Sequence, residues 1–356
     1  MRRLTTEGQR AVLERALAET NEQTDGLSQD DFSAATPEHP GWAIGPFRRD
    51  EALAFRPRGQ APDPVGIGWT SASIFNPSLI ADGDDLVMFY RSSPRKESLS
   101  SRIGMARRRG GTAGESAGWE DLGPVLWPTL DNELYGCEDP KIYRADGRWF
   151  LFYNGIFPVE ADDRARFPSP GYPLGDVGCD INLAVSDDLV HWEKLGPIID
   201  HEESRLWVKG AVIVRDPSGA PIRIGSEYLM YLSEGCGGRA LVGRSADLVA
   251  WEWVEQPYLD LTPLGGHLLE VACAVAGHRG SDLILDFFYS DKDGAFAAAQ
   301  AHYDLAHPFE QTEISRGGTL SWGGLLQQDG QWLIAQGWDA PPGEREISLY
   351  RAPIRT

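Results

Sequence analysis

The sequence predicts an all-β protein, a five-bladed β-propeller with a short N-terminal helix. A unit made of a short apolar strand, a turn and an aromatic strand recurs five times along the 356 residues. A polar cluster stands at the start of each unit, and the units follow one another at steps of 63, 70, 61 and 52 residues. The composition, with 12 Trp, 40 Gly and 24 Pro, suits short strands joined by many turns.

The second unit is the clearest copy of the repeat. Its polar cluster at 136–141 leads through an Asp-Gly turn at 146–147 into the aromatic run 149–153, which is the pattern of a β-hairpin. Strand pairs of the same outline occupy segments 75–91, 206–232, 268–289 and 320–335. The residues that open the five units, taken as equivalent, are Asn76, Asp139, Lys209, Glu270 and Trp322.

The repeat length favours propeller blades packed around a channel, because a small antiparallel sheet cannot bury both of its faces alone. A β-sandwich also contains many short strands, but it does not explain why a polar cluster opens every unit. In a propeller the innermost strand of each blade runs along the channel. We therefore expect the five opening residues, although distant in sequence, to converge on one site.

A second repeat marks the outer strands. Segments 181–192 and 240–251 both end in the pattern Ser-x-Asp-Leu-Val-x-Trp, and a looser copy runs from 102 to Trp119. Ser and Asp form local side-chain hydrogen bonds in turns, and a large indole ring is well suited to filling the space between blades. We interpret Trp119, Trp192 and Trp251 as structural residues.

The predicted domain organisation is an N-terminal helix and linker at 1–40, followed by one propeller domain at 41–356. Residues 5–20 have the apolar pattern of a short amphipathic helix, and residues 21–40 are polar and contain Pro and Gly, as linkers do. No run of eighteen apolar residues predicts a membrane span. The first residues also lack the apolar core of a signal peptide, so we expect a cytoplasmic protein.

Charge and cysteine content narrow the class of partner. The net charge of −20 opposes binding to nucleic acid or to an anionic membrane, so a neutral small molecule is the expected partner. The four cysteines are widely spaced, without the paired spacing of zinc ligands, and we expect reduced thiols and no metal. The sequence leaves the oligomeric state open, including a homo-oligomer. The cysteines are Cys137, Cys179, Cys236 and Cys273.

The acidic pair Glu138-Asp139, followed by Pro140, is the first candidate for catalysis. Neighbouring side chains on a strand point to opposite faces, so one carboxylate is expected to face the channel while the other braces the blade or reaches a sugar hydroxyl. Pro140 is expected to hold Asp139 in an extended conformation. An acidic pair ahead of a strand is also typical of a solvated turn. The choice between a turn and a functional site therefore depends on the other residues expected at the channel.

Those neighbours favour a carbohydrate site. Lys209 and Glu270 are embedded in apolar residues, where an ionised group is costly unless it has a role. Charged side chains suit sugar hydroxyls, an aromatic ring suits the face of a sugar, and cleavage of a glycosidic bond needs a carboxylic acid. The expected substrate-binding residues are Asn76, Arg91, Glu138, Lys141, Asp180, Trp207, Lys209, Asp291 and Trp322.

Several of these motifs resemble those of glycoside hydrolase family 130. The resemblance covers about residues 75–300 and rests on four motifs. These are Asn76-Pro77 with Tyr90-Arg91, Gly136-x-Glu138-Asp139-Pro140-Lys141, the Ala-x-Ser-Asp-Asp-Leu-x-x-Trp stretch from Ala184 to Trp192, and Lys209-Gly210-Ala211-Val212. That family contains five-bladed propeller phosphorylases and hydrolases that act mainly on β-mannosides. The resemblance implies a five-bladed fold and activity on small β-linked sugars.

The resemblance also implies roles for individual residues. Asp139 would be the general acid, in the phosphorylases acting through a sugar hydroxyl. Asn76, Arg91 and Lys209 would bind the sugar or the attacking group. The stretch from Phe288 to Asp291 is similar to a Tyr-Tyr-Gly-x-x-Asp element of the family, so Asp291 would be a sugar ligand.

Two departures from the family pattern favour hydrolysis over phosphorolysis. Lys141 stands where the family usually has Arg, and no Tyr-His-Gly element of the phosphorylase type is present. A hydrolase needs a carboxylate base for water, and Glu270 is the candidate, with Glu234 as the second choice. An inverting pair of carboxyl groups lies about 6.5–9.5 Å apart, which leaves room for that water.

We therefore expect an inverting, exo-acting glycosidase that uses no cofactor and acts on small β-linked oligosaccharides, with mannosides as candidates. The first alternative is a glycoside phosphorylase, with inorganic phosphate as co-substrate held by Lys209, Arg91 and Lys141. The second alternative is a sugar-binding propeller without catalysis. The related five-bladed fructosidases and arabinanases are a further alternative, but they normally have Asp where this chain has Asn76.

Overall fold

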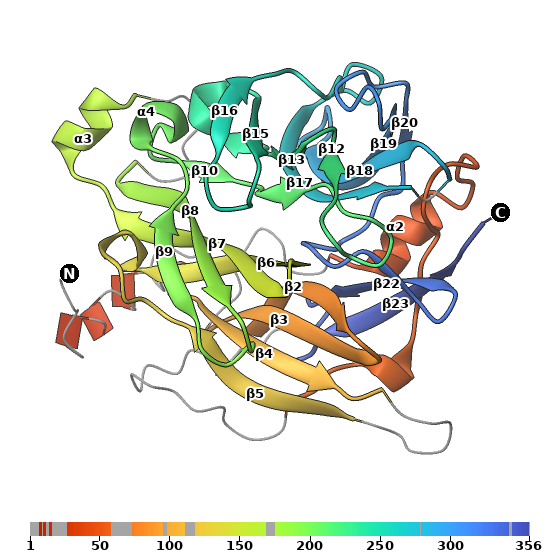
Figure 1. The fold of residues 1–356 in the computed structure, drawn as a ribbon, viewed down its shortest axis with the longest axis horizontal. Helices are drawn as coiled ribbons and strands as arrows, with labels where there is room; N and C mark the ends of the chain where they lie inside the picture. Colours follow the sequence, from red (N-terminus) through yellow and green to blue (C-terminus); the bar gives the residue numbers. More distant parts are fainter. Residues whose placement is uncertain are drawn as a thin grey trace.

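The protein folds as a five-bladed β-propeller, as predicted (Figure 1). The structure is a computed structural model. It describes residues 7–8, 10–11, 14–15, 27–57, 73–94, 98–110, 118–168, 175–277, 279–341 and 344–355. Each blade is an antiparallel sheet whose strands follow one another from the channel outwards, and every blade has at least four strands. This order brings the innermost strand of each blade to the central axis.

The blades follow the order of the chain. Blade one contains β2 (Ser73–Asp82), β3 (Asp85–Ser93), β4 (Arg102–Arg108) and β5 (Trp119–Leu126). Blade two contains β6 (Gly136–Ala145), β7 (Arg148–Pro158), β8 (Val177–Ser186) and β9 (Glu193–Pro197). Blade four contains β17 (His267–Ala276), β18 (Asp282–Ser290), β19 (Phe296–Asp304) and β20 (Glu313–Arg316).

Blade three is the least regular. Its sheet contains β11 (Val212–Ile213), β13 (Glu227–Tyr231), β15 (Leu241–Ser245) and β16 (Glu252–Glu255), with β12 (Arg223–Ile224) paired to β13. Near the axis, β10 (Val208–Lys209) and β14 (Glu234–Gly235) form a separate two-stranded sheet. This small sheet places Lys209 directly opposite Glu234.

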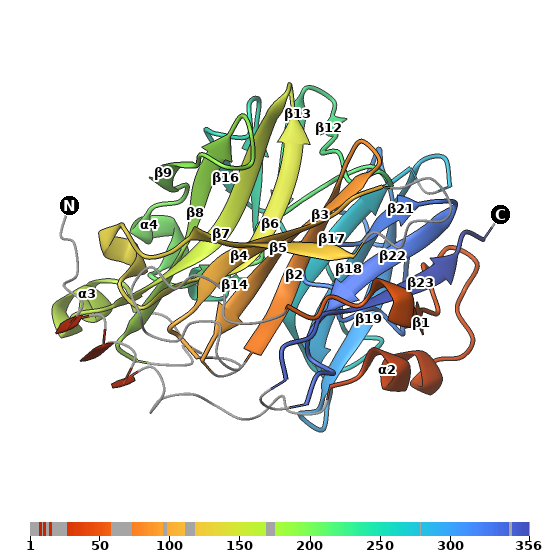
Figure 2. The ribbon, with the colours of Figure 1, turned by 90° about the horizontal axis from the view of Figure 1, so that it is seen from below.

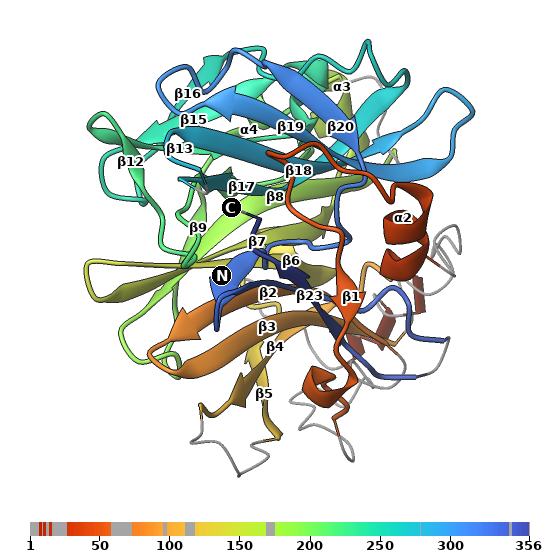
Figure 3. The ribbon, with the colours of Figure 1, turned by 90° about the vertical axis from the view of Figure 1, so that its right-hand side faces the viewer.

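Blade five is completed by the N-terminal part of the chain. It contains β21 (Leu326–Gln328), β22 (Gln331–Gln336), β23 (Ser348–Pro353) and, at its outer edge, β1 (Arg48–Arg49). Figures 2 and 3 both show β1 beside β23. Because β1 comes before blade one in the sequence, its pairing with β23 joins the two ends of the ring and covers an edge that would otherwise be open.

The tryptophans of the outer repeats pack between blades, as predicted. The Trp192 ring of blade two lies edge-on to Phe89 of blade one, with centroids 5.6 Å apart. The Trp251 ring of blade three meets Phe152 of blade two in the same way at 6.0 Å. In both turns the indole N–H donates to the carbonyl of the turn leucine at 3.2 Å. These rings therefore fix the spacing of neighbouring blades.

The N-terminal region differs from the predicted linker. Within 21–40, helix α2 (Gln29–Ala35) packs beside blade five, and the Gln29 side chain accepts a hydrogen bond from Leu320 N at 2.8 Å (Figures 2 and 3). Ser28 caps the helix through Asp31 N, which gives this polar stretch a defined start. The helix predicted at 5–20 lies largely outside the described residues, and those described at 7–8, 10–11 and 14–15 are helical. The boundary at residue 40 stays a prediction.

The remaining helices are short, and the cysteines are reduced. Helices α3 (Ala161–Arg166) and α4 (His201–Ser204) lie between strands of blades two and three. The single-turn helices are η1 (Glu51–Leu53), η2 (Asp131–Glu133) and η3 (Cys236–Gly238). All four cysteines are buried as free thiols. In the part of the chain that the structure describes, no helix has the length and apolar character needed to cross a membrane.

Candidate active site

A pocket of about 160 Å³ lies where the five blades meet. Charged side chains come from the first four blades, and the last two contribute most of the aromatic wall. The lining residues are Asn76, Arg91, Asp139, Lys209, Glu234, Leu269, Glu270, Phe288, Phe296, Trp322 and Trp338. All five residues that open the sequence repeats are among them, so propeller closure brings together side chains that lie up to 246 positions apart in the chain.

Asn76 and Asp139 stand at equivalent irregularities of the inner strands β2 and β6. In both strands the pairing with the neighbouring strand shifts register at this point. Asn76 has a φ angle of 45° and Asp139 one of 49°, in the left-handed region that Asn and Asp tolerate better than other residues with side chains. The extended conformation predicted for Asp139 is therefore wrong, because a β-bulge, and not Pro140, sets its backbone.

The bulge also brings both carboxylates of the acidic pair to the same two cations. Arg91 donates to Glu138 Oε1 at 2.6 Å and to Asp139 Oδ1 at 3.1 Å. Lys209 Nζ donates to Glu138 Oε2 at 3.3 Å and to Asp139 Oδ2 at 3.2 Å. Of the two carboxylates only Asp139 lines the pocket, while Glu138 braces Arg91 and Lys209 behind it. This matches the expectation that one faces the channel and the other braces the blade, although a bulge interrupts the regular alternation of side chains between them.

This charge cluster holds Asp139 in its ionised form. Burial by itself would raise the pKa of Asp139, but the Lys209 ammonium and the Arg91 guanidinium outweigh burial and hold that pKa well below its ordinary value. The hydrogen bond from Asn76 Nδ2 to Asp139 Oδ1, at 2.6 Å, acts in the same direction. The Glu138 side chain is as deeply buried as that of Asp139, and burial raises its pKa despite the same two cations.

The environment of Glu270 raises its pKa, whereas that of Asp139 lowers the pKa. Its carboxylate accepts from Lys141 Nζ and from Trp322 Nε1, both at 3.3 Å. Burial raises the pKa of Glu270, and the ammonium groups of Lys141 and Lys209 only partly oppose that effect. Lys141 also donates to the Trp322 carbonyl at 2.5 Å, so it ties blade two to blades four and five beneath the pocket.

Glu234 is the third carboxylate of the pocket. Its Oε1 accepts from the Trp207 indole N–H at 2.9 Å, and burial raises its pKa against the attraction of Lys209. The pocket thus combines one carboxylate whose pKa is lowered with two whose pKa values are raised. Carboxyl groups that differ in this way are what acid–base cleavage of a glycosidic bond requires.

Comparisons with known proteins point to one family. The family model described as beta-1,4-mannooligosaccharide phosphorylase, that of glycosyl hydrolase family 130, matches residues 48–164. A 1,2-beta-oligomannan phosphorylase from Thermoanaerobacter sp. (strain X514) is 26% identical over 168 residues, which are 46% of this chain and 46% of that relative. These comparisons support glycoside hydrolase family 130, or a related family of five-bladed glycosidases, as the family that this chain resembles.

Solved structures share the propeller fold. A glycosyl hydrolase from Bacteroides ovatus superposes with a TM-score of 0.64 at 19% identity, over 89% of this chain and 96% of that one. The beta-1,2-mannobiose phosphorylase from Listeria innocua superposes with a TM-score of 0.59 at 12% identity, over 86% and 97%. The matches to curated relatives span less than half of those relatives' length. Their activity therefore bears on this chain only as a proposal.

Two of the predicted sugar-binding residues, Asp180 and Asp291, do not line the pocket. Asp180 is buried outside the pocket, where Asn132 Nδ2 donates to it at 3.0 Å and His201 Nε2 lies 3.2 Å away. Asp291 lies in the turn after β18, and its Oδ1 accepts from the backbone N–H groups of Asp293 and Ala295. Their sugar-binding roles stay predictions.

Three further predicted ligands support the pocket from behind. Glu138 and Lys141 are buried beneath it and orient Arg91, Lys209 and Glu270. Trp207 lines a neighbouring cavity and reaches the pocket only through its hydrogen bond to Glu234. These three residues position the side chains that face the pocket.

Sequence reasoning missed much of the aromatic wall. Trp338 donates to Asn76 Oδ1 at 2.7 Å, which turns the amide of Asn76 toward Asp139. Phe288 packs on Trp322 with ring centroids 4.1 Å apart, and Phe296 lies beside them. The Gly337-Trp338 pair after the aromatic strand of blade five was a usable signal, because it ends the last repeat near the axis. Phe296 opens an ordinary strand and offered no such signal.

Proposed function

We propose that this protein is an enzyme that cleaves glycosidic bonds in small β-linked oligosaccharides, with β-mannosides as its substrate class. The observation that carries the proposal is the convergence of Asp139, Glu234 and Glu270 on one small pocket with an aromatic wall. Carboxyl groups supply the acid and the base, and aromatic rings suit the apolar face of a sugar. The names of the related proteins, an oligomannan phosphorylase and a mannobiose phosphorylase, support the choice of mannosides.

We propose hydrolysis as the reaction, with inversion at the anomeric carbon. Arg91 and Lys209, the two cations of the pocket, are already paired with Asp139 and Glu138. Two more carboxylates, Glu234 and Glu270, line the same space and would repel a phosphate dianion. Water carries no charge, and it needs the carboxylate base that these residues supply.

In the proposed reaction Asp139 protonates the leaving oxygen, and Glu270 or Glu234 removes a proton from the attacking water. The acid role of Asp139 follows the family resemblance. The pKa of Asp139 is lowered and the pKa values of Glu234 and Glu270 are raised, so a proton shared between the acid and the base is more stable on the glutamate. A single proton shared between acid and base is enough for catalysis, and its transfer from glutamate to Asp139 creates the reactive form.

Phosphorolysis is the second candidate, and the comparisons favour it. The matching family model and both curated relatives are described as phosphorylases. Phosphate would then replace water as the attacking group and would have to separate Lys209 or Arg91 from Asp139. A protein that binds sugar without cleaving it remains the third alternative.

Proton NMR of the protein with β-linked manno- and gluco-disaccharides, with and without phosphate, separates these functions. Hydrolysis releases a free sugar in both samples, with the α-anomer appearing first. Phosphorolysis releases a sugar 1-phosphate only where phosphate is present. Absence of turnover with every disaccharide under both conditions would contradict the proposed enzyme activity.

A further inference from the structure

A second cavity of about 470 Å³ lies directly beside the central pocket, along blades three and four. The two share Glu234, and consecutive residues of β17 line them in turn, with Leu268 in the larger cavity and Leu269 in the central pocket. The central pocket, at about 160 Å³, has room for a small group, whereas the larger cavity falls within the ≈ 300–1,000 Å³ range of ligand sites. This cavity is below called the side cavity.

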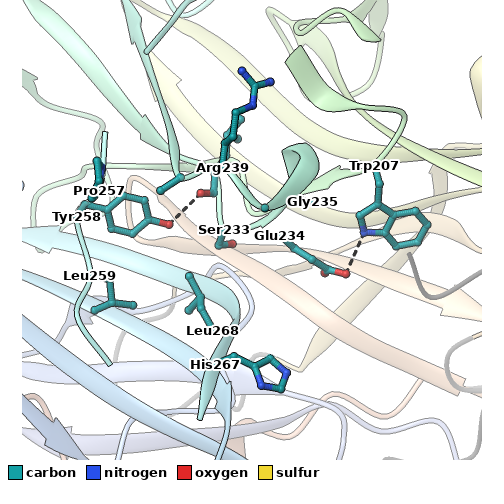
Figure 4. Close-up of a pocket in the computed structure, with 13 residues that line it drawn as sticks. Trp207, Ser233, Glu234, Gly235, Arg239, Pro257, Tyr258, Leu259, His267 and Leu268 are labelled. Carbon is teal, nitrogen blue, oxygen red and sulfur yellow. Dashed lines mark hydrogen bonds between the residues drawn. The ribbon is translucent and has the colours of Figure 1, made fainter. Parts of the chain in front are cut away.

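The walls of the side cavity combine apolar and hydrogen-bonding groups (Figure 4). Leu259 and Leu268 form part of its apolar surface, and the exposed ring of His267 stands on the strand that carries Leu268. Ser233 Oγ is buried and has no hydrogen-bond partner among the described residues. A buried hydroxyl without a partner is costly, so a ligand that hydrogen-bonds to it gains from the contact.

The charges around the side cavity favour a neutral occupant. Arg239 lines it, but its guanidinium is paired with the Glu203 carboxylate at 2.9 Å and with the Glu203 carbonyl at 2.6 Å. Figure 4 shows the Arg239 side chain extending away from Ser233 and Glu234. The Glu234 carboxylate lies at the boundary with the central pocket and would repel an anion. A phosphate ion therefore suits the side cavity less well than a sugar.

We infer that the side cavity binds the sugar unit on the leaving-group side of the scissile bond, as a neutral pyranoside. The inference rests on the proposed function and makes it more specific. A disaccharide would place its non-reducing sugar in the central pocket and its second sugar against Ser233, His267 and Leu259. The scissile bond would then lie next to Glu234, at the boundary between the two cavities.

This arrangement also distinguishes the two candidate bases. In an inverting reaction the base lies on the face of the sugar opposite the leaving group. Glu234 borders the side cavity, whereas Glu270 lines only the central pocket. The base is therefore Glu270, and Glu234 contacts the bond region from the leaving-group side. Asp139 also lines only the central pocket, so its proton reaches the leaving oxygen through a hydroxyl of the sugar bound there.

The test compares a substrate with a leaving sugar and one without. For each variant, kcat/KM is measured with β-1,2-mannobiose and with β-mannosyl fluoride, and the ratio of the two values is taken. Ser233→Ala and His267→Ala each remove one hydrogen-bonding group and are expected to lower the ratio by about threefold to tenfold. Leu259→Trp fills the cavity and is expected to lower it more than tenfold.

His307→Ala is the matched control, because His307 is an exposed histidine that lines a separate pocket with Phe309 and Arg244. Its ratio is expected to equal that of wild type. An unchanged ratio in Leu259→Trp and in both alanine variants would overturn the inference. So would a loss of phosphate binding in His267→Ala without any change in the ratio, since the cavity would then be an anion site.

Calorimetry keeps the inference testable if the protein proves inactive. Wild type is expected to bind β-1,2-mannobiose more tightly than mannose, and Leu259→Trp is expected to abolish that difference. If this happens without turnover, the proposed function fails while the side-cavity inference stands. If the disaccharide is cleaved but binds no more tightly than mannose, the inference fails while the function stands.

Discussion

Lys209 Nζ lies 3.2 Å from Asp139 Oδ2, and this contact largely determines the charge of the proposed proton donor. The same ammonium lies opposite Glu234 in the small sheet formed by β10 and β14. Lys209 thus lies beside both Asp139, whose pKa is lowered, and Glu234, whose pKa is raised. The pH dependence of the enzyme should reflect this position.

Replacing Lys209 with methionine is expected to move the acid limb of the kcat/KM profile to higher pH. The active form carries one proton shared between Asp139 and the base, so activity rises as pH passes the lower pKa of the pair. The ammonium depresses the pKa of Asp139, and its removal raises that value. The profile is measured with β-1,2-mannobiose, whose cleavage needs the proton of Asp139, and an acid limb at the wild-type position would contradict the assignment.

Replacing Asp139 with asparagine should separate the two substrates. Cleavage of a disaccharide needs a proton on the leaving oxygen, so its kcat is expected to fall by about 10²–10⁴-fold. Fluoride leaves without that proton, so hydrolysis of β-mannosyl fluoride is expected to fall much less. If Asp139→Asn loses both activities equally, Asp139 is the base and one of the glutamates is the acid.

The variants Glu270→Gln and Glu234→Gln are expected to differ in how much activity they lose with each substrate. A base is needed whatever the leaving group is, so Glu270→Gln should lose about 10²–10⁴-fold with both the disaccharide and the fluoride. Glu234→Gln keeps a hydrogen-bonding group beside Trp207 and should reduce mainly the cleavage of the disaccharide. Equal losses in the two variants with fluoride would show that Glu270 has no special role.

Asp286 predicts a pH dependence of stability that is independent of catalysis. It is fully buried on β18, where it accepts hydrogen bonds from Thr319 N and Gln300 Nε2. Neither of these partners is a cation, and burial raises the pKa of Asp286 from 3.8 to about 7. The folded protein keeps this proton after the unfolded chain has released it. Stability from this group is therefore complete below about pH 4 and is lost as pH rises to about 7, by on the order of 4 kcal/mol.

Urea denaturation of wild type and Asp286→Asn at pH 5 and pH 7.5 measures this effect. The asparagine variant does not titrate, so its free energy of unfolding should change less between the two pH values. Asp84→Asn, which removes an exposed carboxylate in the turn between β2 and β3, serves as the control. A wild-type protein that loses no more stability than Asp286→Asn would contradict the prediction.

Asp291→Ala tests the sugar-ligand role implied by the family resemblance. The Asp291 carboxylate accepts from two backbone N–H groups of its own turn and does not line the pocket. We expect a lower melting temperature and a KM for β-1,2-mannobiose within about twofold of wild type. An increase in KM of tenfold or more would restore Asp291 as a sugar ligand.

Periodicity made the fold predictable from the sequence. The five repeats, the turn that ends at Trp192 and its copy at Trp251 are local patterns, and their spacing alone implies blades around an axis. The convergence of the five opening residues followed from the same reasoning. It holds because innermost strands of a propeller share one channel, whatever their separation in sequence.

The tertiary structure alone decided how the side chains within the site are paired. The left-handed backbone of Asp139 arises from a bulge between paired strands, and no sequence rule places it there. The aromatic wall and the side cavity are assembled from residues of different blades. The local sequence thus determined which residues reach the axis. Contacts between distant strands decided their orientation and charge, because burial and neighbouring ions exist only after the ring has closed.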